Sequence, residues 1–168
     1  MTLEEHIGNL PKNKRCDIAV RLTRLALPIW DKYAEKNELT YRDTVVGLQH
    51  SVNRALLKNT IDAVEKYIST NFIGKAIIKN TALLSLSRQF SDPIVALQDL
   101  DWKLPYEVER TFYSVYNLLD STLGKEKTAF YEKTIYVTIN QAIDALSSSN
   151  LMNEKEIREI LYGNKSGL

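Results

Sequence analysis

The chain has 168 residues, of which 44% are hydrophobic and 26% charged, a composition typical of one folded domain and not of a disordered chain. Its 22 basic and 21 acidic residues nearly cancel, which argues against the basic surface that general nucleic-acid binders carry. Cys16 is the only cysteine, no signal peptide is recognisable, and no apolar run is long enough to span a membrane. We therefore expect one cytoplasmic domain over residues 1–168, without membrane association.

The opening of the chain predicts two helices. Thr2 and Glu5 have the spacing of a capping box, which favours a short helix that ends near Asn9. The next segment, residues 12–36, repeats apolar residues at steps of three and four, as one face of an amphipathic helix does. Pro28 lies within this segment and has no amide hydrogen, so we expect a kink there or a break into two pieces.

Two more helices are predicted between residues 40 and 70. Thr40 and Asp43 are typical of a helix start, and apolar residues then recur at three- and four-residue steps up to Leu56. Asn59 or Thr60 can cap the helix that follows, because their side chains can accept hydrogen bonds from its first amides.

Residues 72–98 give a mixed signal. The run FIGKAII at residues 72–78 would suit a strand, but the length of the segment and its leucines favour a helix. Asp92 followed by Pro93 is typical of an N-cap and the first helical position, so a short new helix is expected there. The following stretch, LQDLDWKLP at residues 97–105, is interpreted as an irregular connection.

The segment that follows predicts two long helices. Pro105 can begin the first, and Gly124 is well placed to end it in the left-handed conformation that suits glycine. Residues 133–139, KTIYVTI, are the strongest strand candidate in the chain because β-branched residues alternate with others. An apolar stripe from Tyr131 to Leu146 extends well beyond any strand, however, and favours a helix.

A last helix is predicted to begin at Asn153, with Glu156 completing a capping pair, and to end at Gly163. We expect residues 164–168 to be frayed. The predicted fold is therefore all-α, a single-domain array of about seven to nine helices with a proline-kinked second helix near Pro28.

The histidine and cysteine residues form no recognisable catalytic or metal-binding motif. His6 and His50 share no local spacing with each other or with Cys16, so no metal site, cofactor or enzymatic activity is expected. His6 is interpreted as a solvated residue and His50 as part of a polar helix flank. Cys16 has Lys14 and Arg15 nearby, which would lower a thiol pKa, but packing at the margin of the apolar stripe is the favoured interpretation.

A basic cluster marks the start of the predicted 12–36 helix. We interpret it as a solvated face, because a nucleic-acid contact would need interleaved aromatic residues that this segment lacks. No nucleic acid is therefore expected among the partners. The cluster consists of Lys12, Lys14, Arg15, Arg21 and Arg24.

Acidic and aromatic residues gather in and around the connection that ends at Pro105. A solvated acidic edge is one interpretation, and a docking surface for a basic partner is another. Trp102 either fills the core from a loop or serves as an aromatic anchor rimmed by charge. The candidate partner-binding residues are Asp99, Asp101, Trp102, Tyr106, Glu107 and Glu109.

The segment CDIAVRLTRLALPIWDKYAEKN, residues 16–37, resembles the opening of small all-helical bacterial families. These are immunity proteins encoded beside polymorphic toxins, together with a related uncharacterised helical domain. Their opening helix carries an apolar stripe, an arginine, a Leu-Pro or similar step, and then an aromatic residue. Here these features are Arg24, Leu27-Pro28, and Trp30 or Tyr33. The resemblance covers the first third of the chain and implies a helical array that works by binding rather than catalysis.

The leading hypothesis is an immunity-type protein that neutralises a cognate toxin by direct contact. If that toxin is a basic nuclease, the acidic candidates can stand in for phosphate, with Trp102 and Tyr106 as anchors. The alternative is a helical structural or regulatory adaptor that acts through self-association as a homo-oligomer. An enzyme whose site is assembled from distant polar residues and a nucleic-acid binder are the remaining hypotheses.

Overall fold

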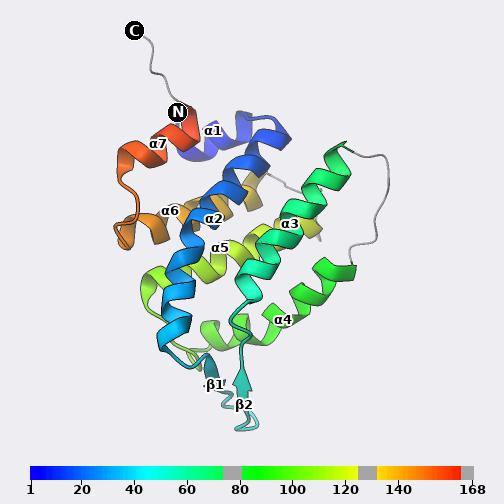
Figure 1. Cartoon of the computed structure of the whole chain (residues 1–168), viewed down its shortest axis with the longest axis vertical. Helices are drawn as coiled ribbons and strands as arrows, with labels where there is room; N and C mark the ends of the chain where they lie inside the picture. Colours follow the sequence, from blue (N-terminus) through cyan, green and yellow to red (C-terminus); the bar gives the residue numbers. More distant parts are fainter. Residues whose placement is uncertain (74–80, 125–131, 164–168) are drawn as a thin grey trace.

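The computed structural model describes residues 1–73, 81–124 and 132–163, and within them it contains seven helices and a two-stranded sheet (Figure 1). The helices are α1 (Leu3–Asn9), α2 (Lys12–Lys36), α3 (Leu56–Ile73), α4 (Thr81–Gln98), α5 (Tyr106–Leu123), α6 (Glu132–Ser148) and α7 (Glu154–Tyr162). The strands β1 (Thr40–Arg42) and β2 (Gln49–Ser51) lie between α2 and α3. The predicted all-α class is confirmed, with this small sheet as an addition. The predictions for residues 74–80 and 164–168 lie outside the described residues.

Helices α2, α5 and α6 form the centre of the fold. α5 packs against α6, α2 and α3, while α1 packs on α6 and α4 packs on both α3 and α5. In Figure 1, α1 and α7 lie at one end of the molecule and the β1–β2 hairpin lies at the other, with α2 running between them. The buried apolar residues form one core cluster, to which each of the seven described helices contributes.

Four aromatic side chains pack together in the part of the core that contacts the hairpin: Trp30, Phe90, Trp102 and Phe112. The ring centroid of Phe112 lies 5.5 Å from that of Trp30, 5.2 Å from that of Phe90 and 5.5 Å from that of Trp102. The Trp30 indole Nε1 donates a hydrogen bond to the Arg54 carbonyl at 2.9 Å, which satisfies its only polar atom. These rings join α2, α4, α5 and the connection between α4 and α5 in one packed unit.

The first two helices follow their sequence signals. The Thr2 hydroxyl accepts from the Glu5 amide at 3.1 Å, and the Glu5 carboxylate accepts from the Thr2 amide at 2.7 Å, so the predicted capping box is confirmed. α2 runs unbroken through Pro28, and the predicted alternative of a break into two pieces is wrong. Pro28 is exposed while Leu27 and Ile29 on either side are buried, so packing on both sides holds the helix together.

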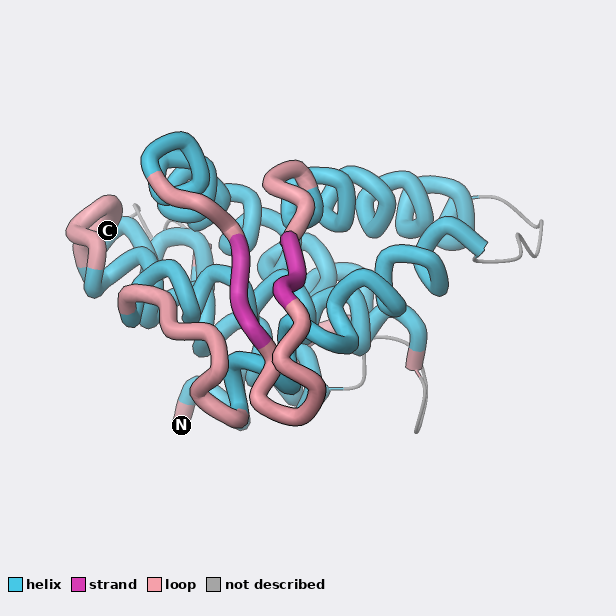
Figure 2. The backbone as a smooth tube through the Cα atoms, turned by 90° about the horizontal axis from the view of Figure 1, so that it is seen from below, coloured by secondary structure: helices cyan, strands magenta, loops and turns pink. Residues whose placement is uncertain are grey.

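The helix predicted to start at Thr40 and Asp43 is wrong, because this segment forms the antiparallel hairpin of β1 and β2, with Tyr41 opposite His50 (Figure 2). The Asp43 carboxylate accepts hydrogen bonds from the amides of Val46 and Gly47, at 2.7 and 3.2 Å. An aspartate that could cap a helix therefore caps a turn instead. Gly47 has a φ of +70°, a left-handed conformation that a right-handed α-helix does not contain.

The boundaries around α3 and α4 also differ from the prediction. α3 already begins at Leu56, and Thr60 donates its hydroxyl hydrogen to the Leu56 carbonyl at 2.7 Å from inside the helix instead of capping it. α4 continues through Asp92 and Pro93, so the helix start predicted there is wrong. Its buried stripe runs across this point at three- and four-residue spacing, which stabilises one continuous helix. The stripe consists of Leu83, Leu86, Phe90, Ile94 and Leu97.

The last three helices agree with the prediction. α5 has Pro105 at its N-cap and ends at Gly124, which adopts the left-handed conformation with a φ of 59°. α6 includes the whole of residues 133–139, so the helix interpretation of KTIYVTI is confirmed. The Asn153–Glu156 capping box starts α7, with the Glu156 amide donating to Asn153 at 3.0 Å.

Candidate protein-interaction surface

The predicted binding residues do not form one surface. Asp99 and Asp101 belong to the turn after α4, beside the hairpin, because the Asp101 carboxylate accepts from the Thr44 amide at 3.2 Å. Glu107 instead lines a groove of about 520 Å³ between α2, α5 and the loop before α7, where Lys36 is also found. Asp99 and Asp101 therefore lie beside the hairpin, whereas Glu107 lies on a different face of the molecule.

The remaining candidates on α5 make local contacts. Tyr106 is exposed, and the Arg110 guanidinium lies 5.0 Å from the centre of its ring. Arg110 also lies 3.9 Å from the Asp144 carboxylate on α6. Glu109 is half-buried and lies near Tyr113, whose pKa is raised by burial and by that negative charge. These contacts join α5 to its own neighbours and do not connect it with the hairpin.

Trp102 is buried, with only 5% of its surface exposed. Its ring stacks on Tyr41 at a centroid distance of 5.7 Å and meets Phe112 edge-on. The interpretation of Trp102 as a residue that fills the core from a loop is thus confirmed, and its side chain is not available as a surface anchor. Its actual role is to hold the hairpin against the helices, because Tyr41 belongs to β1.

The turn between β1 and β2 presents apolar side chains to solvent. Val45 is 90% exposed, Val46 67% and Leu48 60%, and Leu100 in the adjacent turn is 69% exposed. In Figure 1 the turn projects beyond the helices at the end of the molecule opposite α1 and α7. Exposed apolar residues clustered on a projecting turn are typical of a protein-binding site. We call this set the tip surface; it consists of Val45, Val46, Leu48, Asp99, Leu100 and Asp101.

Hydrogen bonds fix the backbone of this turn from several directions. The Asp43 amide donates to the Leu48 carbonyl at 3.0 Å, and the Arg42 guanidinium donates to the Gly47 carbonyl at 2.6 Å. The Asp43 carboxylate also lies 2.6 Å from His50 Nε2, and the His50 ring stacks on Tyr41. A turn fixed in this way loses little conformational entropy on binding, which favours affinity.

Asp43 makes the turn sensitive to acid. Hydrogen bonds from the Val46 amide and from His50 hold the pKa of the Asp43 carboxyl below its usual value. The ionised form therefore stabilises the turn at all pH values above about 3.9, the ordinary pKa of aspartate, and this stabilisation is lost as the pH falls through the lowered pKa.

We expect the Val46 and Gly47 amides to lose their hydrogen-bonded chemical shifts only in strong acid, in an NMR titration from pH 7 to pH 2. Asp43→Ala should give the acid-like amide shifts already at pH 7. Asp99→Asn, which changes an exposed carboxylate in the neighbouring turn, is the control and should leave both amides unchanged. Wild-type amides that move near pH 6 instead would mean that Asp43 does not control the turn.

The other residues singled out from the sequence have structural roles. His6 is half-buried and its Nε2 lies 2.9 Å from the Leu161 carbonyl, so the prediction of a solvated residue is wrong and His6 joins α1 to α7. His50 lies in β2 and not on a helix flank. Cys16 is fully buried, and this burial raises the pKa of its thiol to about 12.

We expect Cys16 to resist modification by a thiol reagent such as 5,5′-dithiobis(2-nitrobenzoate) at pH 8, because the buried thiol stays protonated. One equivalent should react after denaturation in guanidinium chloride. The unfolded thiol ionises near pH 8.5 and the folded one near pH 12, so folding stability should also decrease as the pH rises above about 8.5. Rapid labelling of the native protein at pH 8 would contradict this prediction.

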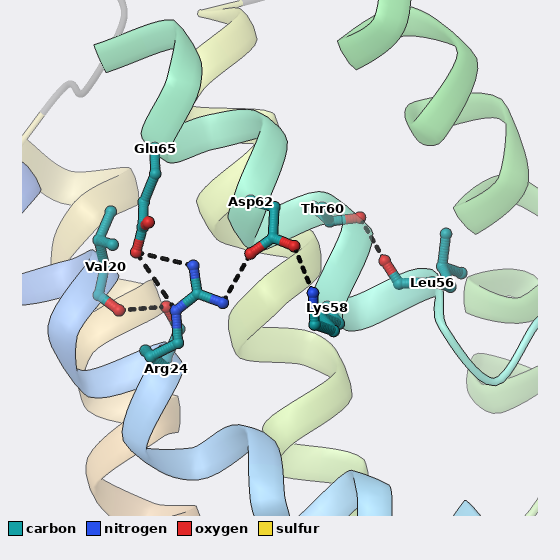
Figure 3. A network of polar contacts seen from close by, with 8 residues as sticks. Val20, Arg24, Leu56, Lys58, Thr60, Asp62 and Glu65 are labelled. Carbon is teal, nitrogen blue, oxygen red and sulfur yellow. Dashed lines mark hydrogen bonds and ion pairs between the residues drawn. The ribbon is translucent and has the colours of Figure 1, made fainter. Parts of the chain in front are cut away.

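Part of the predicted basic cluster is paired with acidic residues. Arg24 lies 2.8 Å from Asp62 and 2.8 Å from Glu65, so it joins α2 to α3 (Figure 3). Lys58 also contacts Asp62, and hydrogen bonds from Lys58 and Arg24 lower the pKa of the Asp62 carboxyl. Arg24 is a member of the cluster that is more than a solvated residue, because its guanidinium joins α2 to α3.

Grooves on the described surface include three with different linings. One of about 780 Å³ lies between α1 and α7 and contains His6, Arg158 and Tyr162. Another of about 580 Å³ lies between α2 and α3 beside Arg24 and Glu65. The third is the α2–α5 groove described above. Within residues 1–73, 81–124 and 132–163, no group of three or more histidine, cysteine or acidic side chains is arranged to hold a metal ion.

The helices described in the structure are all too short or too polar to cross a membrane. No protein-family model, curated protein or solved structure matches the chain. The apolar part of the tip surface was not predicted, because the hairpin that carries Val45, Val46 and Leu48 was expected to be a helix. An aspartate four residues before a glycine, with Thr44, Val45 and Val46 between them, was the signal of a turn.

Proposed function

We propose that this protein is a cytoplasmic immunity-type protein that neutralises a cognate bacterial toxin by direct contact through the tip surface. The observation that carries the proposal is the ordered turn itself, which exposes Val45, Val46 and Leu48 while hydrogen bonds fix its backbone. Exposed aliphatic groups gain free energy when a partner removes them from water, at about 25 cal/mol per Å² of apolar surface. The tip is therefore suited to binding another protein.

The packing beneath the tip supports this proposal. Trp102 stacks on Tyr41 from below, and Asp101 binds Thr44 from the side, so two contacts connect the tip to the helical core. Movement of the tip relative to the helices is restricted as a result. A rigid projecting element lowers the entropic cost of covering a toxin active site or of holding a toxin in an inactive shape.

The toxin part of the proposal is supported by the resemblance of residues 16–37 to immunity proteins. The residues that carry the resemblance serve the fold: Arg24 pairs with Asp62 and Glu65, and Trp30 is fully buried. Arg24 and Trp30 therefore support a helical framework of the kind that the resemblance implies. In this proposal, binding belongs to the hairpin and the adjacent turn.

A second candidate is an adaptor that acts through self-association. The same exposed valines favour it, because the tip of a second copy could cover them in a symmetric dimer. The two candidates differ in what the isolated protein does. An adaptor of this kind is a homodimer on its own, whereas an immunity protein is expected to form its complex only with the toxin.

The experiment is an affinity pulldown of the tagged protein from its source bacterium, followed by light scattering of the retained complex. Co-expression of the retained protein in a heterologous host then shows whether it is toxic and whether this chain relieves the toxicity. A paired Val45→Ser and Val46→Ser variant should lose at least tenfold in affinity. Val137→Ser, an exposed valine on α6, is the matched control and should bind normally.

The pulldown could instead retain only this chain, as a stable dimer that dissociates when Val45 and Val46 are replaced by serine. That result would support the adaptor function and contradict the immunity function. A stoichiometric complex with a protein whose toxicity the chain abolishes would support the immunity function. Neutralisation by a variant that no longer binds the toxin would contradict the proposed mechanism of direct contact.

A further inference from the structure

α7 is attached to the rest of the molecule through a small buried surface. It spans 9 residues, of which Ile157 and Leu161 are buried and Ile160 is half-buried. Isolated helices shorter than about 12–15 residues are barely stable in water, because few hydrogen bonds offset the cost of starting the first turn. α7 is therefore helical because it is docked, and its docking depends on these few side chains.

The hydrogen bonds at the start of α7 are local. Asn153 and Glu156 cap each other and therefore belong to α7 itself. The turn before them belongs to α6, because the Leu151 and Met152 amides donate to the Leu146 carbonyl at 3.1 and 3.5 Å. The junction between Met152 and Asn153 thus separates two units that are each closed by their own hydrogen bonds, and α7 can turn about it.

The other end of α7 is held by His6 of α1. His6 Nε2 donates to the Leu161 carbonyl at 2.9 Å, and this is one of the last carbonyls of α7, which lack amide partners within the helix. The His6 ring also lies 4.3 Å from the Tyr162 ring, and the Arg158 guanidinium lies 5.4 Å from the centre of the same ring. One side chain of α1 therefore caps α7 and packs against its last turn.

The contact between α1 and α7 is open to water on one side. The groove of about 780 Å³ between the two helices is lined by His6, Arg158 and Tyr162, and Tyr162 is 38% exposed. Water in this groove can donate to the Leu161 carbonyl in place of His6. Breaking the His6 hydrogen bond therefore costs less free energy here than it would in the closed core.

We infer that α7 is a strap that opens as one unit about the Met152–Asn153 junction while the other helices stay folded, and that His6 holds it closed. Opening removes Ile157 and Leu161 from the core and exposes the apolar surface that they cover. Such a partial opening costs less free energy than complete unfolding, because most of the buried side chains stay in place. The strap lies at the end of the molecule opposite the tip surface, so the inference does not depend on the proposed function (Figure 1).

The test is native-state hydrogen exchange of the full chain, followed by NMR in low concentrations of guanidinium chloride. We expect the amides of residues 157–162 to share one opening free energy and one denaturant dependence. Their protection should be at least about 100-fold below that of the amides around Phe112 in α5. Protection that falls steadily from residue 157 to residue 162 would show fraying of the helix end and would overturn the inference.

A destabilising change far from α7 separates opening of the strap from complete unfolding. Ile61 is fully buried in α3, which lies apart from α7 in Figure 1. Ile61→Val should speed exchange in α5 about two- to tenfold and leave residues 157–162 unchanged, because this side chain stays buried when α7 alone opens. Equal acceleration of both sets would mean that α7 opens only when the whole protein unfolds, and would overturn the inference.

His6→Ala tests how α7 is held closed. It should speed exchange of residues 157–162 about two- to tenfold, which is the effect of losing one hydrogen bond. Glu4→Ala, which changes an exposed residue of the same helix, is the matched control and should leave these amides unchanged. Equal exchange rates in the two variants would overturn the role of His6.

Discussion

Replacement of Phe112 by alanine is expected to lower the free energy of unfolding by about 3–5 kcal/mol. Phe112 is fully buried, and its ring contacts Trp30, Phe90 and Trp102, so its removal leaves a cavity between three other rings. A domain of this size has a total stability on the order of 5–15 kcal/mol, and the variant would keep only part of it. Urea denaturation followed by tryptophan fluorescence measures the loss.

Tyr106→Ala is the control for Phe112→Ala, because it removes an aromatic ring from the exposed start of the same helix. Its side chain contacts the Arg110 guanidinium, so a loss of less than about 1 kcal/mol is expected. Similar losses for both variants would show that the aromatic group around Phe112 is not the stabilising part of the core.

Trp102→Ala is expected to have the second large effect, again about 3–5 kcal/mol, with a consequence that Phe112→Ala lacks. Trp102 contacts Tyr41 of β1 on one side and Phe112 of α5 on the other. Its removal should loosen the hairpin from the helices, and amide hydrogen exchange of Tyr41 and His50 should become faster than in Phe112→Ala.

Trp102→Phe restores a ring in the same place and should recover part of the stability and most of the protection of the hairpin. The double variant of Trp102 and Phe112 tests their contact, since contacting residues give non-additive losses. A hairpin whose exchange rates do not change in Trp102→Ala would mean that β1 and β2 are held by Asp43, Thr44 and Asp101 alone.

The parts of the fold that could be predicted are those that depend on neighbouring residues. The capping boxes at Thr2 and Asn153 need only a side chain and an amide three residues away, and both are present. Gly124 ends α5 for an equally local reason. The described stripe of α6 runs from Ile135 to Leu146, about three turns, which is longer than the strand candidate at residues 133–139 and favours a helix.

The wrong predictions came from local sequence patterns that are compatible with two different secondary structures. Asp43 can cap a helix or a turn with the same carboxylate, and the Tyr41 ring of β1 stacks on Trp102, about sixty positions further along the chain. Asp92 and Pro93 look like a helix start, but burial of Phe90 and Ile94 keeps α4 continuous across them. In each case a contact distant in sequence overrode a local preference.

The candidate site was predicted only in part. Asp99 and Asp101 stand out because charge is visible in the sequence, and the structure places their turn beside the hairpin. Val45 and Val46 could not be recognised, since exposed valines look the same in sequence as the buried residues of a stripe. Only the placement of the turn outside the core distinguishes them.

The contact of His6 with the Leu161 carbonyl and the Tyr162 ring has a practical consequence for handling the protein. It brings α1 and α7 together at the end of the molecule farthest from the hairpin (Figure 1). A tag or surface linker attached before Met1 would therefore point away from the tip. Immobilised through its N-terminus, the protein would present the β1–β2 turn outward, in the orientation that a capture experiment requires.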